Sequence, residues 1–161
     1  MIDNYQRIQS IIIFEISNTA FCANLDDVYI IKRVIEPNQA EMINRFEKGY
    51  TRSNNDDIVL IDMAKYFDLP ATRAKPSSRI IIINHFIVEG QMTLRYGFMV
   101  DKVNEIVALS YNNNYQLLNF TKSGNDDFLE AKLLFENREL LLPDFSKIGA
   151  LLLENKAKCS N

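Results

Sequence analysis

The sequence has little of what catalysis and cofactor binding usually require. Among 161 residues there is one histidine, His85, and there are two cysteines, Cys22 and Cys159. A single histidine cannot supply a metal-binding cluster, and no phosphate-binding glycine loop or paired-cysteine motif occurs. Two cysteines placed so far apart do not indicate a disulfide framework, which favours a reducing cytoplasm. We therefore expect no enzymatic activity, no metal and no cofactor.

An excess of positive charge and long apolar runs are also missing. The formal net charge is −3, and the longest basic run is the pair Lys32-Arg33. So little positive charge gives no attraction to a polyanion, and we expect no nucleic-acid partner. No apolar run approaches the roughly 20 residues that cross a bilayer, and residues 1–10 do not resemble a signal peptide. The expected location is the cytoplasm, without direct membrane insertion.

Glycine is scarce, with five residues, whereas isoleucine forms two short runs at 11–13 and 80–83. β-Branched side chains favour strands, and the four-residue run is typical of a strand buried on both faces. A chain of this length buries about 70% of its unfolded surface, so a substantial core is available. We expect one domain over residues 1–153, with a polar linker near 70–78 between two halves and a polar tail at 154–161.

A strand followed by a capping residue and a helical turn recurs four times. These units cover residues 20–31, 58–69, 95–109 and 140–151. In the last three, Asp62, Asp101 and Asp144 are each predicted to cap a short helix, because an aspartate carboxylate can accept backbone N–H groups of a first turn. The helical pieces are shorter than the dozen or so residues that cross over a parallel sheet. The repeat therefore favours a barrel architecture.

The unit at residues 95–109 looks like the clearest copy. Its first half alternates in the manner of a strand. After Asp101, the apolar residues Val103, Ile106 and Val107 are spaced i, i+3 and i+4, which predicts one face of a short helix.

Five motifs, in this order along the chain, resemble the CheW-like domain, a family of adaptors in bacterial chemosensory arrays. The resemblance extends from about residue 11 to residue 152. The motifs are an opening hairpin with Phe14, Phe21 and Val28, the glycine Gly49, a strand and helix around Asp62, the sequence Val100-Asp101-Lys102-Val103, and a closing hairpin and helix at 135–148.

The resemblance implies a mainly β fold of two intertwined small five-stranded β-barrels, SH3-like, with short helices and an apolar groove between the barrels. It implies a non-enzymatic scaffold that couples the cytoplasmic tip of a methyl-accepting chemoreceptor to the regulatory domain of a CheA-type histidine kinase. Such a protein is expected in the cytoplasm, at receptor arrays of the inner membrane.

The resemblance also places four candidate groove residues, Val28, Ile31, Gly49 and Val103. Each has a plain structural interpretation as well. The three apolar side chains can be ordinary packing residues, and Gly49 can satisfy a backbone turn.

Two departures from the family pattern bear on partner choice. The family's Asn-Leu-Arg-Gly turn is replaced here by Arg52-Ser53-Asn54-Asn55, so that Asn54 stands at the arginine position and Asn55 at the glycine. Lys102 replaces the glycine that usually follows the Val-Asp pair. These changes are compatible with a specialised adaptor, such as one of a pilus-type chemosensory system. The alternative class is a small β-barrel that binds a ligand or nucleic acid, which a deep polar pocket or a basic stripe would favour.

Overall fold

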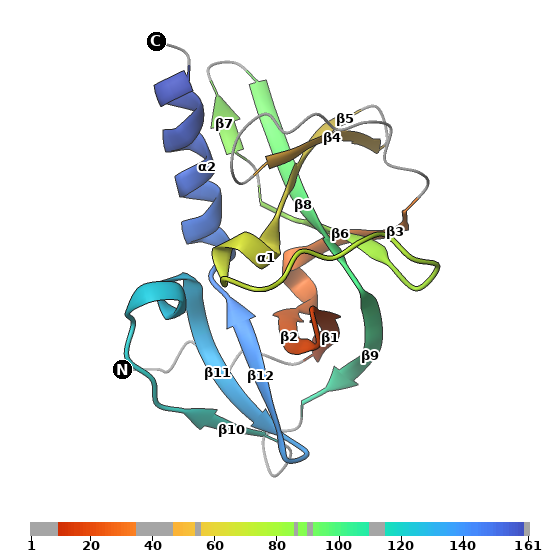
Figure 1. Ribbon diagram of the computed structural model, residues 1–161, viewed down its shortest axis with the longest axis vertical. Coiled ribbons are helices and arrows are strands. Elements are labelled where there is room, and N and C mark those ends of the chain that lie inside the picture. The colour runs from red at the N-terminus through yellow and green to blue at the C-terminus, as the bar shows by residue number, and fades with distance from the viewer. Residues whose placement is uncertain are drawn as a thin grey trace.

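The computed structural model describes residues 10–34, 47–53, 56–85, 87–89, 92–109 and 115–159. Their strands form two sheets, one above the other in Figure 1, with short helices at the junction and one longer helix beside the upper sheet. This confirms the expected mainly β fold with short helices.

The lower sheet has the strand order β10-β11-β12-β2-β1-β9. Its strands are β1 (Ser10–Ile16), β2 (Thr19–Asn24), β9 (Lys102–Ala108), β10 (Tyr115–Leu118), β11 (Leu129–Phe135) and β12 (Arg138–Pro143). Neighbours are antiparallel except β12 and β2, which run parallel.

The upper sheet has the strand order β3-β6-β8-β5-β4, with β7 paired to β8. Its strands are β3 (Val28–Arg33), β4 (Glu47–Ser53), β5 (Asp56–Ile61), β6 (Arg79–Ile83), β7 (Ile87–Glu89) and β8 (Met92–Val100). Only β5 and β8 run parallel. Each sheet thus has six strands, one more than the five expected for each barrel, since β7 and β10 add to the two sets.

The helices are η2 (Leu25–Asp27), α1 (Met63–Tyr66), η3 (Gly124–Phe128) and α2 (Phe145–Cys159). η2, α1 and α2 follow β2, β5 and β12, as the repeated pattern of strand, cap and helical turn predicts. The segment 70–78 joins α1 to β6. The strands before and after it, β5 and β6, both belong to the upper sheet.

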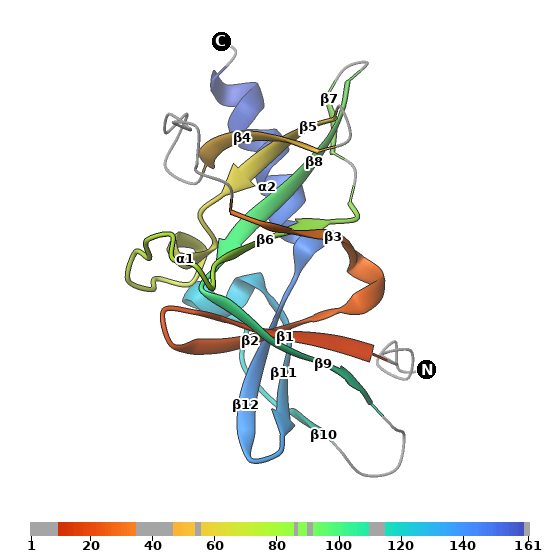
Figure 2. The same cartoon turned by 90° about the vertical axis from the view of Figure 1, so that its right-hand side faces the viewer.

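The predicted helix after Asp101 is wrong. Residues 102–108 form strand β9, and Figure 2 shows β8 of the upper sheet continuing through a bend into β9 of the lower sheet. Val103 pairs with Phe14, and Val107 pairs with Ile11 in β1. In a strand these two valines can pack inward while Ile106, which is 58% exposed, points to solvent. The helical spacing was therefore coincidental, and strand pairing decided the conformation of these β-branched residues.

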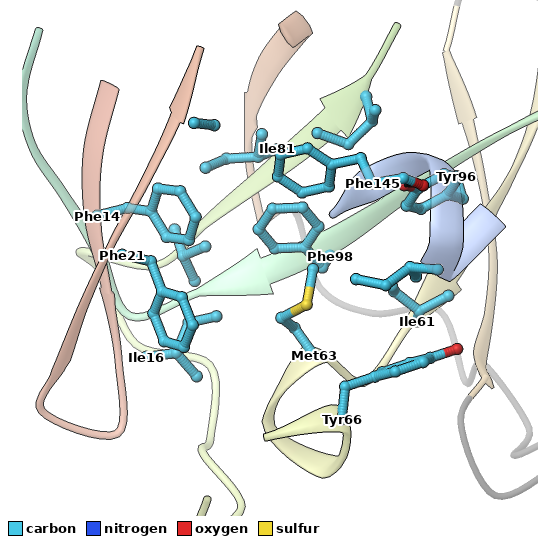
Figure 3. Close-up of a cluster of buried hydrophobic side chains, with 14 of the residues drawn as sticks. Phe14, Ile16, Phe21, Ile61, Met63, Tyr66, Ile81, Tyr96, Phe98 and Phe145 are labelled. Carbon is cyan, nitrogen blue, oxygen red and sulfur yellow. Dashed lines mark hydrogen bonds between the residues drawn. The ribbon is translucent and has the colours of Figure 1, made fainter. Parts of the chain in front are cut away.

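A central core fills the space between the two sheets (Figure 3). Phe14 and Phe21 from the lower sheet, Phe98 from the upper sheet and Phe145 from α2 all contribute. The ring centroid of Phe14 lies 5.5 Å from that of Phe98, which lies 5.9 Å from that of Phe145. Such aromatic contacts contribute roughly 0.5–1.5 kcal/mol each beyond area burial, so they help fix the sheets against each other.

The isoleucine run of β6 serves two cores at once. Ile81 and Ile83 face the central core, whereas Ile80 and Ile82 pack with Ile58 on the other face of the upper sheet. All four are buried, which confirms the prediction of a strand covered on both sides.

Gly97 on β8 pairs with Ile82 on β6 and leaves little room for a side chain. A Cβ atom on Gly97 would lie 2.8 Å from the Ile81 carbonyl oxygen and 3.2 Å from Cγ1 of Ile82. The first of these atoms belongs to the backbone of a central strand, which cannot move without disturbing the ladder.

We therefore expect Gly97→Ala to lower the free energy of unfolding by about 1–3 kcal/mol, the usual cost of overpacking a core. The melting temperature, followed by circular dichroism, should fall by roughly 2 to 10 °C. Ala108→Val, which adds carbon atoms at an exposed position of β9, is the control and should stay within about 0.5 kcal/mol. Equal melting temperatures for the wild type and Gly97→Ala would contradict this account.

Candidate partner-binding surface

Val28 and Ile31 lie on β3, a terminal strand in the order of the upper sheet. Val28 directly follows η2, and its backbone N–H donates to the carbonyl oxygen of Leu25. Val28 pairs with Ile83 and Ile31 pairs with Ile81. Both side chains are partly buried and pack against the central core, so each keeps some surface in contact with solvent.

Val103 reaches the same core from the other sheet. It lies on β9, a terminal strand in the order of the lower sheet, and is also partly buried. β3 and β9 both lie on the side of the molecule that faces the viewer in Figure 2. Gly49 is placed differently, because it lies on β4, at the end of the upper sheet opposite to β3, where it pairs with Leu60. Three of the four candidate groove residues thus pack against the same core cluster, from terminal strands of the two sheets.

Two exposed apolar side chains extend this surface. Leu25 on η2 is 36% exposed and Tyr29 on β3 is 38% exposed. The guanidinium carbon of Arg95 lies 3.5 Å from the centroid of the Tyr29 ring, a cation–π contact that holds the ring in place. We call Leu25, Val28, Tyr29 and Ile31 the η2–β3 surface. Sequence periodicity grouped these residues but gave no sign that two of them face solvent.

The structure describes only some of the residues that depart from the family pattern. Asn54 and Asn55 lie outside the described residues. Lys102 is the first residue of β9, and its Nζ lies 3.3 Å from Oε2 of Glu15. Because Lys102 is largely exposed, this ion pair is screened by water and contributes little to stability.

Asp62 and Asp144 both lie directly before helices. Oδ1 of Asp144 accepts a hydrogen bond from the backbone N–H of Lys147 at 3.0 Å, so Asp144 caps α2. Asp62 occupies the corresponding position before α1, but its buried side chain makes no capping hydrogen bond. Only its carbonyl oxygen contributes to the turn, by accepting from the N–H of Lys65 at 3.1 Å.

Asp101 does not cap a helix, since it lies at the bend between two strands. Its Oδ2 accepts from the backbone N–H of Ser17 at 2.8 Å and lies 3.9 Å from Nζ of Lys75. Its own N–H donates to the carbonyl oxygen of Glu15, and its carbonyl oxygen accepts from the hydroxyl of Ser77, both at 2.8 Å. Asp101 therefore ties the β1–β2 hairpin, the 70–78 segment and the bend together.

A depression of about 420 Å³ lies beside Asp101. Its walls are the tip of the β1–β2 hairpin and the start of the 70–78 segment: Ser17, Asn18, Pro70, Ala71, Thr72, Arg73, Ala74, Lys75 and Asp101. The volume falls in the range of small-molecule sites, roughly 300–1,000 Å³, but those sites are mostly apolar and deep. This depression is formed largely by exposed loop residues, and the carboxylate in it is already bonded within the protein.

Cys22, Asp27 and His85 are side chains of types that enzymes use in catalysis. Cys22 is buried, and burial raises the pKa of its thiol to about 12, so the reactive thiolate is disfavoured. Nε2 of His85 lies 3.3 Å from the hydroxyl of the exposed Ser146. Burial raises the pKa of the Asp27 carboxyl, and the nearby His85 partly opposes that shift.

Within the ranges given above, no three histidine, cysteine, aspartate or glutamate side chains are grouped to hold a metal ion. In the same part of the chain, no helix combines the length and the apolar character needed to cross a membrane.

Comparisons with known proteins agree with this fold. The family model described as the CheW-like domain matches residues 10–151. Among solved structures, the scaffolding protein TtCheW from Thermoanaerobacter tengcongensis is similar, with a TM-score of 0.69, 18% sequence identity and 90% of each chain covered. No curated protein sequence matches the chain significantly.

The contacts of Asp101 predict the effect of removing its side chain. Asp101→Ala leaves the partly buried N–H of Ser17 without its acceptor, and we expect a loss of about 1.5–3 kcal/mol in the free energy of unfolding. Asp144→Ala, which removes a helix cap, is the comparison and should cost about 1 kcal/mol. Urea titrations of both variants would measure the difference. A loss for Asp101→Ala no larger than that for Asp144→Ala would argue against its joining role.

Proposed function

Since the chain belongs to the CheW-like domain family, we propose that it is a non-enzymatic adaptor of bacterial chemosensory signalling. It couples the cytoplasmic tip of a methyl-accepting chemoreceptor to the regulatory domain of a CheA-type histidine kinase. The protein acts in the cytoplasm, at receptor arrays on the inner membrane, and its mechanism is binding alone.

One observation carries the receptor part of the proposal. Val28, Ile31 and Val103, from terminal strands of two different sheets, share the central core and still keep partial exposure. Leu25 and Tyr29 add apolar area beside them. An amphipathic helix laid across such residues buries its apolar side against a surface that the core already holds in position. Each buried Å² of apolar area contributes about 25 cal/mol, so a few such side chains supply useful affinity.

The kinase part of the proposal uses a sheet edge. β9 is terminal in the order of the lower sheet and carries Ile106, which is 58% exposed. Terminal strands offer backbone groups and side chains to a partner sheet. A kinase domain of the same fold presents a similar edge, which makes an edge-to-edge contact a reasonable arrangement.

The departures from the family pattern refine the partner set. Lys102 stands where the family pattern has a glycine, and it forms an ion pair with Glu15. Asn54 stands where the family's turn has an arginine. We propose that this adaptor serves a specialised system, such as a pilus-type one, with altered contacts to its receptor or kinase.

We expect Val28→Asp to weaken binding of a receptor-tip peptide by at least about tenfold, because the new carboxylate must lose water when the helix docks. Val107→Asp is the matched control. Val107 is a partly buried valine that packs against a different core cluster of the lower sheet. Both variants should lose similar stability, whereas only Val28→Asp should lose affinity in titration calorimetry.

Equal affinity losses for the two valine variants, or equal affinity for wild type and Val28→Asp, would remove the η2–β3 surface from the proposal. Failure of the wild type to bind both the receptor tip and the kinase regulatory domain would contradict the adaptor function itself.

The diverged turn gives a second binding prediction. Asn54→Arg combined with Asn55→Gly restores the charged fork of the family's turn, which can bond a partner carboxylate in two places. We expect affinity for a standard receptor tip or kinase domain to rise roughly five- to 150-fold. Asn54→Lys with Asn55→Gly adds a positive charge without the guanidinium group, and its affinity should rise less. Unchanged or lower affinity for the arginine variant would mean that this chain uses another contact.

A further inference from the structure

Two arginines face each other across neighbouring strands of the upper sheet. Arg33, the last residue of β3, is directly opposite Arg79, the first residue of β6, in an antiparallel ladder. Like charges in directly opposed positions destabilise a sheet. This arrangement needs an explanation, since either position could hold a neutral residue without changing the strands.

No acidic side chain of the described residues neutralises the pair. One guanidinium nitrogen of Arg79 donates to the carbonyl oxygens of Pro76 and Ser78, at 2.9 and 2.7 Å. These bonds hold the guanidinium in place, but carbonyl oxygens carry no formal charge and do not neutralise it. Arg33 is exposed and, in the part of the chain that the structure describes, makes no ion pair with a carboxylate.

The neighbouring segment adds more positive charge. Residues 73–79 contain Arg73, Lys75 and Arg79 and no acidic residue, although the whole chain has a net charge of −3. The acidic group described beside them is Asp101, whose Oδ2 lies 3.9 Å from Nζ of Lys75 and is also bonded to the backbone of Ser17. Among the described residues, positive charge is therefore concentrated at this end of β3 and β6.

The arginine pair lies on the same face of the sheet as Ile31, one residue of the η2–β3 surface. Side chains two residues apart in a strand point to the same side, so Ile31 and Arg33 share a face, as do their partners Ile81 and Arg79. Along β3, that face changes from apolar at Ile31 to cationic at Arg33.

We propose that Arg33 and Arg79 bind carboxylates at one end of the amphipathic partner helix that lies on the η2–β3 surface. This inference rests on the proposed function and specifies its partner, a helix with an apolar stripe followed by acidic side chains. Guanidinium groups suit this role because their fork matches a carboxylate and they remain charged at all physiological pH values. The binding of carboxylates also offsets the repulsion between the two arginines.

A protein segment fits better than a membrane or a nucleic acid. Those polyanions present an extended negative field, and the remainder of this acidic chain would be repelled by it. A helix end with two or three carboxylates requires only a local group of cations.

The test uses a variant that should raise the stability of the protein and remove the proposed carboxylate-binding site. Arg33→Glu places opposite charges across from each other, and the melting temperature should rise by roughly 2 to 4 °C. The probes are a synthetic amphipathic helix with two glutamates near one end, the same peptide with glutamines, and the receptor-tip peptide. The wild type should bind the glutamate peptide roughly three- to thirty-fold more tightly than the glutamine peptide at low salt. Arg33→Glu should abolish that preference.

Lys122→Glu is the matched control, since it makes the same change in net charge at an exposed position between β10 and η3. It should keep the preference for glutamate. Equal binding of the two synthetic peptides by the wild type would overturn the inference, as would a preference that survives Arg33→Glu. Binding to anionic phosphatidylglycerol vesicles or single-stranded DNA that is stronger than binding to the glutamate peptide and is lost in Arg33→Glu would also overturn it.

The two proposals fail separately. If the receptor tip binds wild type and Arg33→Glu equally, the arginine site is wrong and the adaptor function stands. If the receptor tip and the kinase domain do not bind at all while the glutamate preference is observed, the arginine site stands and the adaptor function fails.

Discussion

The hydrogen bond from the Ser17 backbone N–H to the Asp101 carboxylate joins the first hairpin of the lower sheet to the bend between β8 and β9. Asp101 lies where the chain leaves the upper sheet and enters the lower one, and Ser17 lies at the turn of the first hairpin. The Asp101 side chain is only 10% exposed, and a buried carboxylate is costly unless it is hydrogen-bonded, so the bond from Ser17 to Oδ2 matters for stability. Lys75 lies 3.9 Å from the Asp101 carboxylate, and the Ser77 hydroxyl donates to the Asp101 carbonyl oxygen. The bend, the hairpin and the 70–78 segment are therefore joined at Asp101.

The sequence was informative where one residue type decided the conformation. The isoleucine runs in β1 and β6 predicted buried strands, and Asp144 indicated where α2 begins. Residues 102–108 were misjudged because Val103, Ile106 and Val107 satisfy a helical spacing as well as a strand. The outcome was decided by pairing with Phe14 and Ile11 in β1, which no local pattern in β9 reveals.

The candidate surface was predicted only in part, for a similar reason. The resemblance to a family pointed to Val28, Ile31 and Val103, whereas the exposure of Tyr29 and the pairing of Arg33 with Arg79 depend on how β3 meets β6. A register shift between Val28 and Ile30 determines which residues of the two strands face each other. A shift of one residue turns every later side chain to the other face. The basic pair Lys32-Arg33 was visible in the sequence, but its partner across the ladder was not.

The interleaved strand order has a consequence for how the protein is made. β1 and β2 are completed early in synthesis, yet their neighbours β9 and β12 come from the second half of the chain. The 84 residues between Ser17 and Asp101 take roughly 4 to 17 seconds to translate, at about 5–20 residues per second. Throughout that time the first hairpin has no neighbouring strands and its isoleucines have no complete core. High contact order of this kind slows folding and leaves nascent chains open to aggregation. Because each sheet takes strands from both sides of residues 70–78, a cut in that segment would divide both sheets.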